Sequence, residues 1–170
     1  MSVLIMTEPE VKALVPQMNK TVDESLIEST LLFTQDTLIK DSIGQDWYEE
    51  LLLQKSGGTY TAANQIIIDN YIKNILAFGV WQNLIINLSL AVNESGLRIK
   101  ISDHSEAASS RDIAFMRDYI QNFIDAKRKE MYRYIKNNKS SYPKYYNDVY
   151  GDKPINNIYN FKIGGIPRLS

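Results

Sequence analysis

The chain has 170 residues, of which 44% are hydrophobic and 23% are charged, a composition typical of a single globular domain with its own core. It contains no cysteine, which excludes disulfides, thiolate nucleophiles and cysteine-ligated metals. Its first residues carry no basic segment ahead of a short apolar run, and no stretch approaches the roughly 20 apolar residues of a membrane-spanning helix. We therefore expect a soluble protein with no secretory signal and no membrane partner.

The net charge of −1 conceals a strong asymmetry along the chain. Residues 1–60 carry ten acidic and four basic side chains, residues 61–110 carry four and three, and residues 111–170 carry six and twelve, so the three parts have net charges of −6, −1 and +6. Such a chain can pair head to tail with copies of itself, or present its basic end to an acidic partner or to nucleic acid. Two ordinary solvated faces would give the same pattern.

Two helices are predicted before residue 45. The motif Thr7-Glu-Pro-Glu10 combines a capping Thr, a Pro that the first turn tolerates, and a Glu three residues after the cap, which predicts a short helix ending near Pro16. From Val22 to about Asp41, apolar or small residues recur at spacings of three and four, which predicts a long amphipathic helix. Gly44 can adopt the backbone conformation that stops this helix.

The next two helices are separated by a loop. Residues 46–53 predict a short helix, and the composition of Lys55-Ser-Gly-Gly-Thr59 predicts the loop that ends it. A further helix is expected from about Thr61 to Asn87, and because it is apolar around much of its circumference it should be the central, most buried helix. Gly79 in its interior costs about 1 kcal/mol relative to Ala, and a close helix crossing would explain that cost.

A β-hairpin is predicted at residues 88–102, set between long helices. Apolar and polar residues alternate from Leu88 to Val92 and from Leu97 to Ser102, on either side of the turn Asn93-Glu-Ser-Gly96. An isolated two-stranded ribbon is marginal in water, so it must lie on its own helices or add to another chain's sheet. We interpret it as a joint between subunits, with the interface residues Leu88, Leu90, Val92, Leu97, Ile99 and Ile101.

The last third of the chain begins with a helix predicted from about Arg111 to Asn137. Its final turns are basic, which also complements the helix dipole. The basic residues that could face DNA are Lys127, Arg128, Lys129, Arg133 and Lys136. From Ser140 to Ser170 the chain is rich in Tyr, Asn, Pro and Gly without a helical period, which predicts an extended arm. The aromatic residues expected to dock this arm on a partner are Tyr142, Tyr145, Tyr146, Tyr150, Tyr159 and Phe161.

The predicted fold is therefore mainly α: a bundle of four to five helices with one inserted β-hairpin and an extended C-terminal arm. Residues 1–139 form the helical domain and residues 140–170 form the arm. The core is expected to contain the large side chains on the buried stripes of three helices, namely Trp47, Tyr71, Phe78, Trp81, Phe115 and Phe123.

No residue pattern favours an enzyme. The single histidine, His104, lies in a polar loop, whereas a metal site or a general base needs several convergent partners. The acidic residues Asp41, Asp46, Glu49 and Glu50 could cluster, but such runs usually form a solvated helix face. No Gly-rich phosphate loop follows a strand, and no Gly-x-Ser-x-Gly motif is present. We expect neither catalysis nor a cofactor.

Nucleic-acid binding is a second interpretation of the C-terminal third. Basic residues from 127 to 144 alternate with tyrosines from 132 to 146, and positive charge combined with stacking rings is what binders of single-stranded nucleic acid use. The same residues also suit a helix C-terminus and a protein interface, where tyrosine is enriched. A stand-alone helical regulator, monomeric or dimeric, is a further alternative.

The order of these elements resembles a family. The two helices at residues 22–41 and 61–87, the strand pair, the loop Asp103-His-Ser-Glu-Ala-Ala-Ser109 and the helix ending Tyr132-Arg-Tyr-Ile-Lys-Asn-Asn138 are similar to the head-to-tail connector, or adaptor, proteins of tailed bacteriophages. The likeness spans roughly residues 5–137 and is closest to the ring proteins of podovirus-like phages of gut Bacteroidales, including the crAss-like group.

This resemblance implies a non-enzymatic virion component, located at the head-tail junction after assembly in the host cytoplasm. Such proteins form a ring of copies, commonly a dodecamer, below the portal protein. The ring extends the DNA channel, so DNA contacts it only in passing, and it presents a platform for the next tail or ring protein. Charge asymmetry suits a closed head-to-tail ring, and an unsatisfied hairpin suits strand addition between neighbours.

Overall fold

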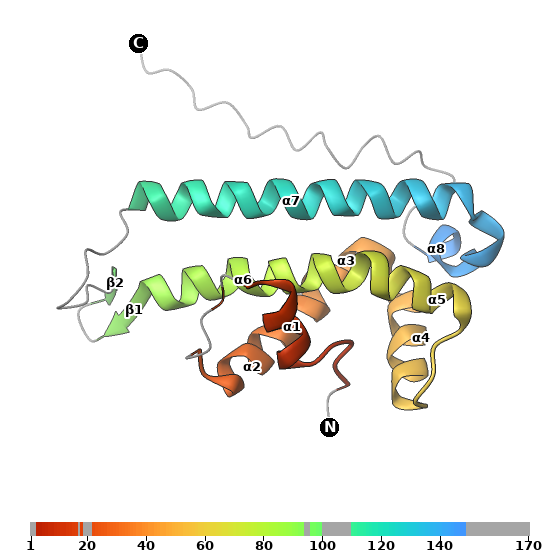
Figure 1. The fold of residues 1–170 in the computed structure, drawn as a ribbon, viewed down its shortest axis with the longest axis horizontal. Coiled ribbons are helices and arrows are strands. Elements are labelled where there is room, and N and C mark those ends of the chain that lie inside the picture. Colours follow the sequence, from red (N-terminus) through yellow and green to blue (C-terminus); the bar gives the residue numbers. More distant parts are fainter. Residues whose placement is uncertain (1–2, 17, 19–21, 94–95, 100–109, 149–170) are drawn as a thin grey trace, which may run out of the picture.

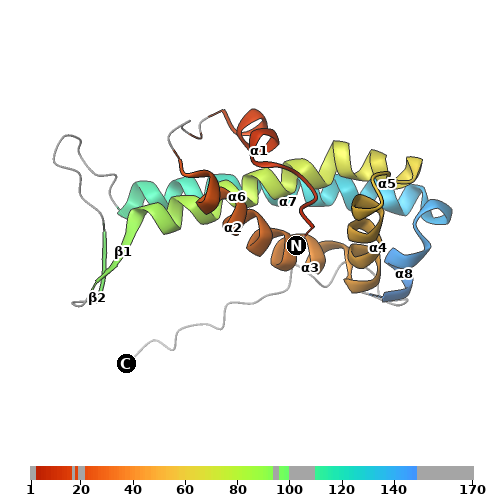
Figure 2. The same cartoon turned by 90° about the horizontal axis from the view of Figure 1, so that it is seen from below.

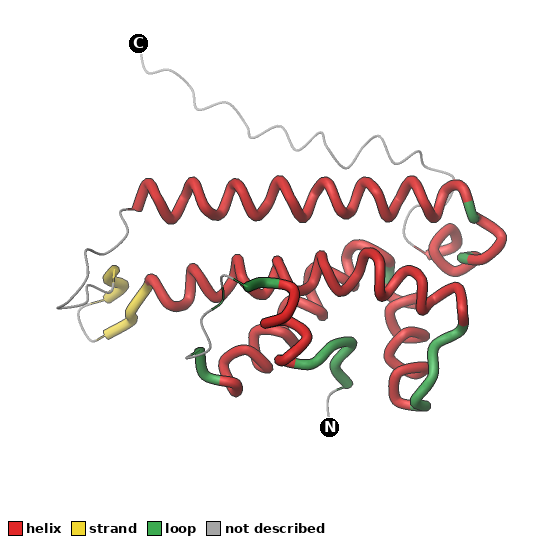
Figure 3. Tube along the Cα trace, viewed as in Figure 1, coloured by secondary structure: helices red, strands yellow, loops and turns green. Residues whose placement is uncertain are grey.

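The computed structural model describes residues 3–16, 18, 22–93, 96–99 and 110–148. This part of the chain is mainly helical, as Figure 3 shows, so the predicted mainly α class is confirmed. Its α-helices are α1 Glu8–Leu14, α2 Glu24–Thr34, α3 Lys40–Ile43, α4 Gln45–Ser56, α5 Ala62–Ile67, α6 Lys73–Ser89, α7 Ser110–Asn137 and α8 Pro143–Asp148. Among the described residues, no helix is both long and apolar enough to cross a bilayer.

The helices form layers around α6. Figure 1 shows α6 and α7 side by side and antiparallel, with α1, α2 and α4 on the side of α6 away from α7. Figure 2, seen from below, shows these shorter helices spread beneath the long pair. The middle position of α6 explains why its apolar residues run around most of its surface.

The two N-terminal helical segments begin and end within about two residues of their predicted bounds. The Thr7 backbone N–H donates to Glu10 Oε2 at 2.8 Å, which closes the capping box of α1. Asp23 caps α2, since its Oδ1 accepts from the Ser25 N–H at 2.8 Å. A π-helical turn, η1 Gln35–Ile39, joins α2 to α3, so one helical segment runs from residue 24 to residue 43 and stops at Gly44, whose φ is +88°.

Gln35 fastens the N-terminal segment to this helical segment. Its side chain is fully buried, its Nε2 donates to the Val3 carbonyl at 2.8 Å, and its Oε1 accepts from the Ile5 N–H at 2.9 Å. These two bonds imitate a rung of a β-sheet and place Ile5 and Met6 in the core. Nothing in the sequence pattern indicated this contact, because a lone glutamine carries no periodicity.

The central helical segment starts at Thr61, whose side chain accepts from the Asn64 N–H at 3.3 Å. It runs through α5, a second π-helical turn η2 Ile68–Ile72, and α6. The prediction that it is the most buried segment is confirmed by its fully buried residues Ile67, Ile68, Ile72, Ile75, Leu76, Ala77 and Val80.

Gly79 marks the close crossing predicted for this segment. A Cβ added there would lie 2.7 Å from Leu38 Cδ2 and 2.8 Å from Thr34 Cγ2. Thr34 is held in place because its hydroxyl donates to the Thr30 carbonyl at 2.7 Å and accepts from Asn83 Nδ2 at 2.9 Å. A larger residue at position 79 would therefore force Thr34 or Leu38 to move at the crossing of α6 with the α2–η1 segment.

One of the aromatic residues predicted to lie in the core is exposed instead. Phe115 is 72% exposed, whereas the buried stripe of α7 consists of Ile120, Ile124, Met131 and Ile135. At 100° per residue, Phe115 points about 140° away from Ile120, which turns it outward. Trp47 is buried as predicted, and Tyr71, Phe78 and Trp81 are partly buried against the core. Phe123 is half-buried, with its ring centroid 4.0 Å from that of Phe78.

The region between α6 and α7 differs in detail from the predicted hairpin. Two short strands, β1 Leu90–Asn93 and β2 Gly96–Ile99, pair antiparallel, with Leu90 opposite Ile99 and Asn93 opposite Gly96. The first predicted strand began too early, because α6 continues its helical bonding through Leu88 to Ser89. Residues 94–95 and 100–109 lie outside the described residues, and with them part of the predicted turn and the end of the predicted second strand.

The predicted boundary between domain and arm at residue 139 is also wrong. A 3-10 turn, η3 Lys139–Ser141, follows α7, and α8 then packs beside α4. Pro143 begins α8, where a proline is well tolerated because the first turn has no helical partner for its missing N–H. The helical domain thus extends at least to residue 148.

Candidate functional site

Two of the tyrosines predicted to dock on a partner lie in the protein's own core. Tyr142 and Tyr145 are 3% and 2% exposed, and their ring centroids lie 5.2 and 5.9 Å from that of Trp47. The Tyr142 hydroxyl donates to the Ala63 carbonyl at 3.0 Å, and burial raises its pKa to about 12. The prediction fails for both residues because Trp47 on α4 offers an apolar seat within reach of α8.

The side chains of the other aromatic residues of the predicted arm lie outside the described residues. Tyr146 lies in α8, but its side chain is outside the described residues, as are Tyr150, Tyr159 and Phe161 entirely. Of the predicted hairpin residues, Leu88 is 42% exposed at the end of α6. Leu90, Val92, Leu97 and Ile99 lie in the paired strands, and Ile101 is outside the described residues.

A polar network lies where α8 packs against α4. Trp47 Nε1 donates to Asn64 Oδ1 at 3.0 Å, and Asn64 Nδ2 donates to Glu50 Oε1 and to Gln54 Oε1, each at 3.0 Å. Lys144 of α8 completes it with an ion pair of 2.9 Å to Glu50. Burial raises the pKa of Glu50, but the hydrogen bonds from Lys144 and Asn64 lower it more, so the net direction is downward. These hydrogen bonds and the ion pair hold α8 against α4, which is what a structural role of these polar side chains requires.

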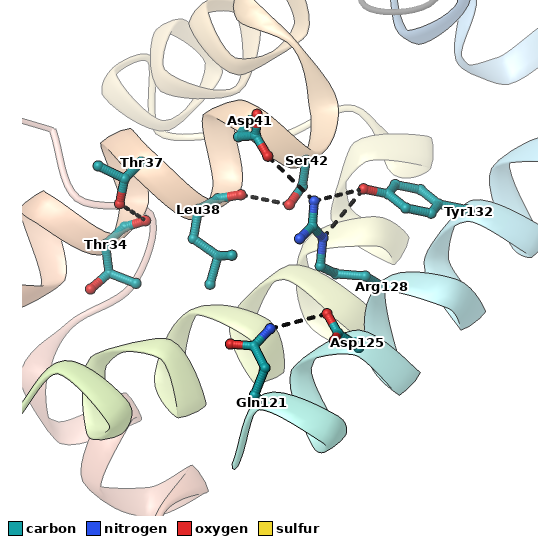
Figure 4. A network of polar contacts seen from close by, with 9 residues as sticks. All are labelled: Thr34, Thr37, Leu38, Asp41, Ser42, Gln121, Asp125, Arg128 and Tyr132. Atoms are coloured by element: carbon teal, nitrogen blue, oxygen red, sulfur yellow. Dashed lines mark hydrogen bonds and ion pairs between the residues drawn. The ribbon is translucent and has the colours of Figure 1, made fainter. Parts of the chain in front are cut away.

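Arg128 does not belong to a DNA-facing surface, contrary to prediction. Its side chain is only 15% exposed, and its Nη2 lies 3.5 Å from Asp41 Oδ2 and 3.2 Å from the Tyr132 hydroxyl oxygen. Figure 4 shows the guanidinium turned from α7 toward α3, where Ser42 donates to the Leu38 carbonyl. The cause is helical spacing, since Arg128 lies on the flank of α7 that faces α3.

The other predicted basic residues divide by face. Lys127 lies beside the buried stripe, pairs with Glu130 at 2.8 Å, and lies 6.0 Å from the Phe123 ring centroid. Lys129, Arg133 and Lys136 are exposed and share the opposite side of α7. The basic patch is therefore a stripe of three residues rather than the five predicted.

The fold places opposite charge on opposite layers. Residues 24–56, which form α2 to α4, contain seven acidic and two basic side chains, a net charge of −5. Residues 110–137, which form α7, contain seven basic and four acidic side chains, a net charge of +3. Because α2 and α4 lie on the side of α6 away from α7, with α3 beside α6, the asymmetry along the chain becomes an asymmetry across the molecule (Figure 1).

Each layer also exposes large apolar side chains. Phe115 and Tyr119 are 72% and 59% exposed on α7, while Phe33 on α2 and Leu53 on α4 are 60% and 73% exposed. Single exposed apolar residues are ordinary, but Phe115 and Tyr119 lie one turn apart on the same face of α7, and such exposed apolar groups are typical of contact surfaces. We refer below to Phe115, Tyr119, Arg133 and Lys136 as the outer face of α7.

Among the described residues, no group of three or more potential metal ligands occurs, and His104 lies outside these residues. Of the acidic residues that could have clustered, Asp41 pairs with Arg128 and Glu50 pairs with Lys144. A hollow of about 350 Å³ beside Trp47 is bordered by the same bonded groups that position α8.

The chain matches the model of a protein family. Residues 15–155 match the model of the family of unknown function DUF6712, which is most of the chain. The chain belongs to this family. The DUF6712 match begins just after α1 and includes α8, which agrees with α8 being part of the folded unit. No curated protein and no solved structure matches the chain.

Proposed function

We propose that this DUF6712 protein is a structural component of a tailed-bacteriophage virion, a head-to-tail connector that forms a ring below the portal protein and extends the DNA channel. It has no catalytic role in this proposal. It is assembled in the host cytoplasm and takes its place at the head-tail junction, where DNA contacts it only in passing and the next tail or ring protein binds it.

The observation that carries this proposal is the layered helical pair with a strand pair at one end. Two long antiparallel helices, α6 and α7, are joined by β1 and β2, and their two sides differ in charge. A ring needs a heterologous contact, in which one surface of a subunit meets a different surface of the next. Opposite charge on opposite layers suits such a contact.

The hairpin at residues 88–102 is proposed to join neighbouring subunits or the adjoining ring. Among the described residues β1 pairs only with β2, and a two-stranded ribbon is marginal without further packing or pairing. Strand addition from a second chain would supply the missing bonds. The arm, now counted from residue 149, is proposed to dock on the portal or on a neighbouring subunit.

The test is assembly in solution. The purified protein is measured by light scattering alone and after mixing with the portal protein encoded in the same genome. We expect a ring of copies, as in a dodecamer, or a defined complex with the portal. The variants Val92→Lys and Ile99→Lys should assemble more weakly, while their helical content stays unchanged. A chain that remains monomeric at high concentration and does not bind the portal would overturn the proposal.

A second candidate is a nucleic-acid-binding helical protein. The exposed stripe of Lys129, Arg133 and Lys136 favours it, but the burial of Tyr142 and Tyr145 removes two of the rings that would stack on bases. Strong, salt-dependent binding of the isolated monomer to a single-stranded oligonucleotide would support this candidate over the connector.

A further inference from the structure

We infer that the outer face of α7 is a docking surface for a second copy of this chain, and that it binds the acidic side of that copy, formed by Glu24 and Glu28 of α2 and Glu49 of α4. This inference rests on the proposed ring and assigns the two surfaces that meet in it. The occupant is identified by charge and by the positions of the two surfaces in the fold.

The outer face of α7 is a continuous stripe on one helix. Phe115 and Arg133 are 18 residues apart, which is five full turns, so they lie on the same side and about 27 Å from each other. Tyr119 and Lys136 lie within about 60° of that line, and all four side chains are exposed. The buried stripe of Ile120 to Ile135 lies on the other side of the helix, so packing against α6 leaves the outer face open in the described structure.

The acidic side lies across the molecule from this stripe. Glu24, Glu28 and Glu49 are exposed on helices that occupy the layer below α6, while α7 forms the layer above it (Figure 1). The exposed apolar residues Phe33 and Leu53 belong to the same lower helices. On α4, Leu53 lies one turn from Glu49, whereas Phe33 lies about 140° from Glu28 around α2, so the two surfaces are matched mainly by the opposite signs of their charges.

A nucleic acid is a poorer occupant of the outer face. The exposed residues Asp118 and Glu130 interrupt the basic charge on α7, and at the N-terminal end of the face the exposed Arg111 is followed by Phe115 and Tyr119 rather than by further bases. Attraction to a phosphate backbone depends on an array of positive charges. Attraction to the −5 layer of another copy depends only on complementary charge at fixed positions.

The experiment inverts each face separately in the full chain. One variant is Arg133→Glu/Lys136→Glu, which makes the outer face acidic. The other is Glu28→Lys/Glu49→Lys, which makes the acidic side basic and avoids the first turn of either helix, where charge acts on the helix dipole. The matched control, Arg117→Glu/Lys127→Glu, changes the net charge of α7 by the same amount on the flank nearer to α6.

Mass is measured by sedimentation equilibrium over a range of concentrations, with far-UV circular dichroism to confirm folding. We expect each face variant alone to associate at least about tenfold more weakly than the wild type, because like charges then meet. An equimolar mixture of the two variants should associate again. One variant then has two acidic faces and the other two basic faces, so opposite charges meet wherever the two variants alternate along the assembly. The control should associate within about threefold of the wild type.

The outcomes separate this inference from the proposed function. A wild type that assembles while both face variants assemble equally well overturns the inference alone, as does a mixture that stays dissociated. Loss of oligonucleotide binding in Arg133→Glu/Lys136→Glu with unchanged mass would assign the outer face to nucleic acid instead. A wild type that never associates, with or without the portal, overturns both.

Discussion

The seat of α8 on Trp47 allows a direct test of where the folded domain ends. Tyr145 is 2% exposed, and its ring centroid lies 5.9 Å from that of Trp47 and 6.1 Å from that of Tyr132. Replacing Tyr145 with Ala removes the ring through which α8 contacts Trp47 of α4 and Tyr132 of α7. If residues from 140 onward formed only an extended docking arm, this change would have almost no effect on the free protein.

The expected loss follows from the buried area. A buried aromatic side chain removes on the order of 150 Å² or more from water, which at about 25 cal/mol per Å² corresponds to roughly 4 kcal/mol as an upper estimate. Truncation of buried aromatic residues to Ala typically costs 3–5 kcal/mol. Because α8 lies near the end of the described chain, it can detach locally, and detachment limits the loss. We expect Tyr145→Ala to lower the free energy of unfolding by about 2–4 kcal/mol.

The assay is urea unfolding followed by tryptophan fluorescence in a Trp81→Phe background, where Trp47 is the only reporter. Detachment of α8 would expose Trp47 to water and shift its emission before the global transition. The control is Phe115→Ala, which should change stability by less than about 0.5 kcal/mol because Phe115 is exposed. A loss below about 1 kcal/mol for Tyr145→Ala, without an emission shift, would refute the packing of α8 on α4.

Three further substitutions test other parts of the fold. Gly79→Ala should destabilise by about 1–2 kcal/mol in chemical denaturation despite its better helix propensity, because the new Cβ meets the fixed Thr34; a stabilised variant would contradict the crossing. The pKa of Glu50 is lowered in the fold, mainly by Lys144, so the stabilisation that ionised Glu50 gives the fold is present above its ordinary pKa of 4.5 and is lost as the pH falls. Glu50→Gln should therefore reduce the loss of stability in acid, and an unchanged dependence of stability on pH would exclude this role of Glu50. Gln35→Leu should cost about 2–3 kcal/mol and speed proteolysis of the N-terminal segment, whereas unchanged cleavage would argue against the clamp.

The sequence was most informative where one physical signal dominated. The spacing of apolar residues located the helices, and the capping residue Thr7 located the start of α1. Gly79 indicated a close crossing because glycine inside a helix is unfavourable without a packing reason. These are local signals, and the structure confirms each of them.

Signals that depend on distant residues were misread. Tyrosines between prolines and glycines predicted an extended arm, yet Tyr142 and Tyr145 are buried because Trp47, almost a hundred residues earlier, provides their seat. Pro143 could have indicated the helix, since proline favours the first turn, but six residues make too short a pattern to detect. The basic residue Arg128 likewise lies on the flank of α7 that faces α3 and pairs with Asp41, a partner that the order of residues does not reveal.

The path of the chain explains why the remaining charges need a second molecule within the proposed ring. The acidic helices precede the central segment and the basic helix follows it, so α6 separates them. Opposite charges meet within one molecule at its edges, where Arg128 reaches Asp41 and Lys144 reaches Glu50. The outer face of α7 points away from the acidic side, so a two-fold dimer would place like surfaces against each other. A head-to-tail contact instead joins unlike surfaces and leaves one of each free at the ends, and association then continues until the ring closes.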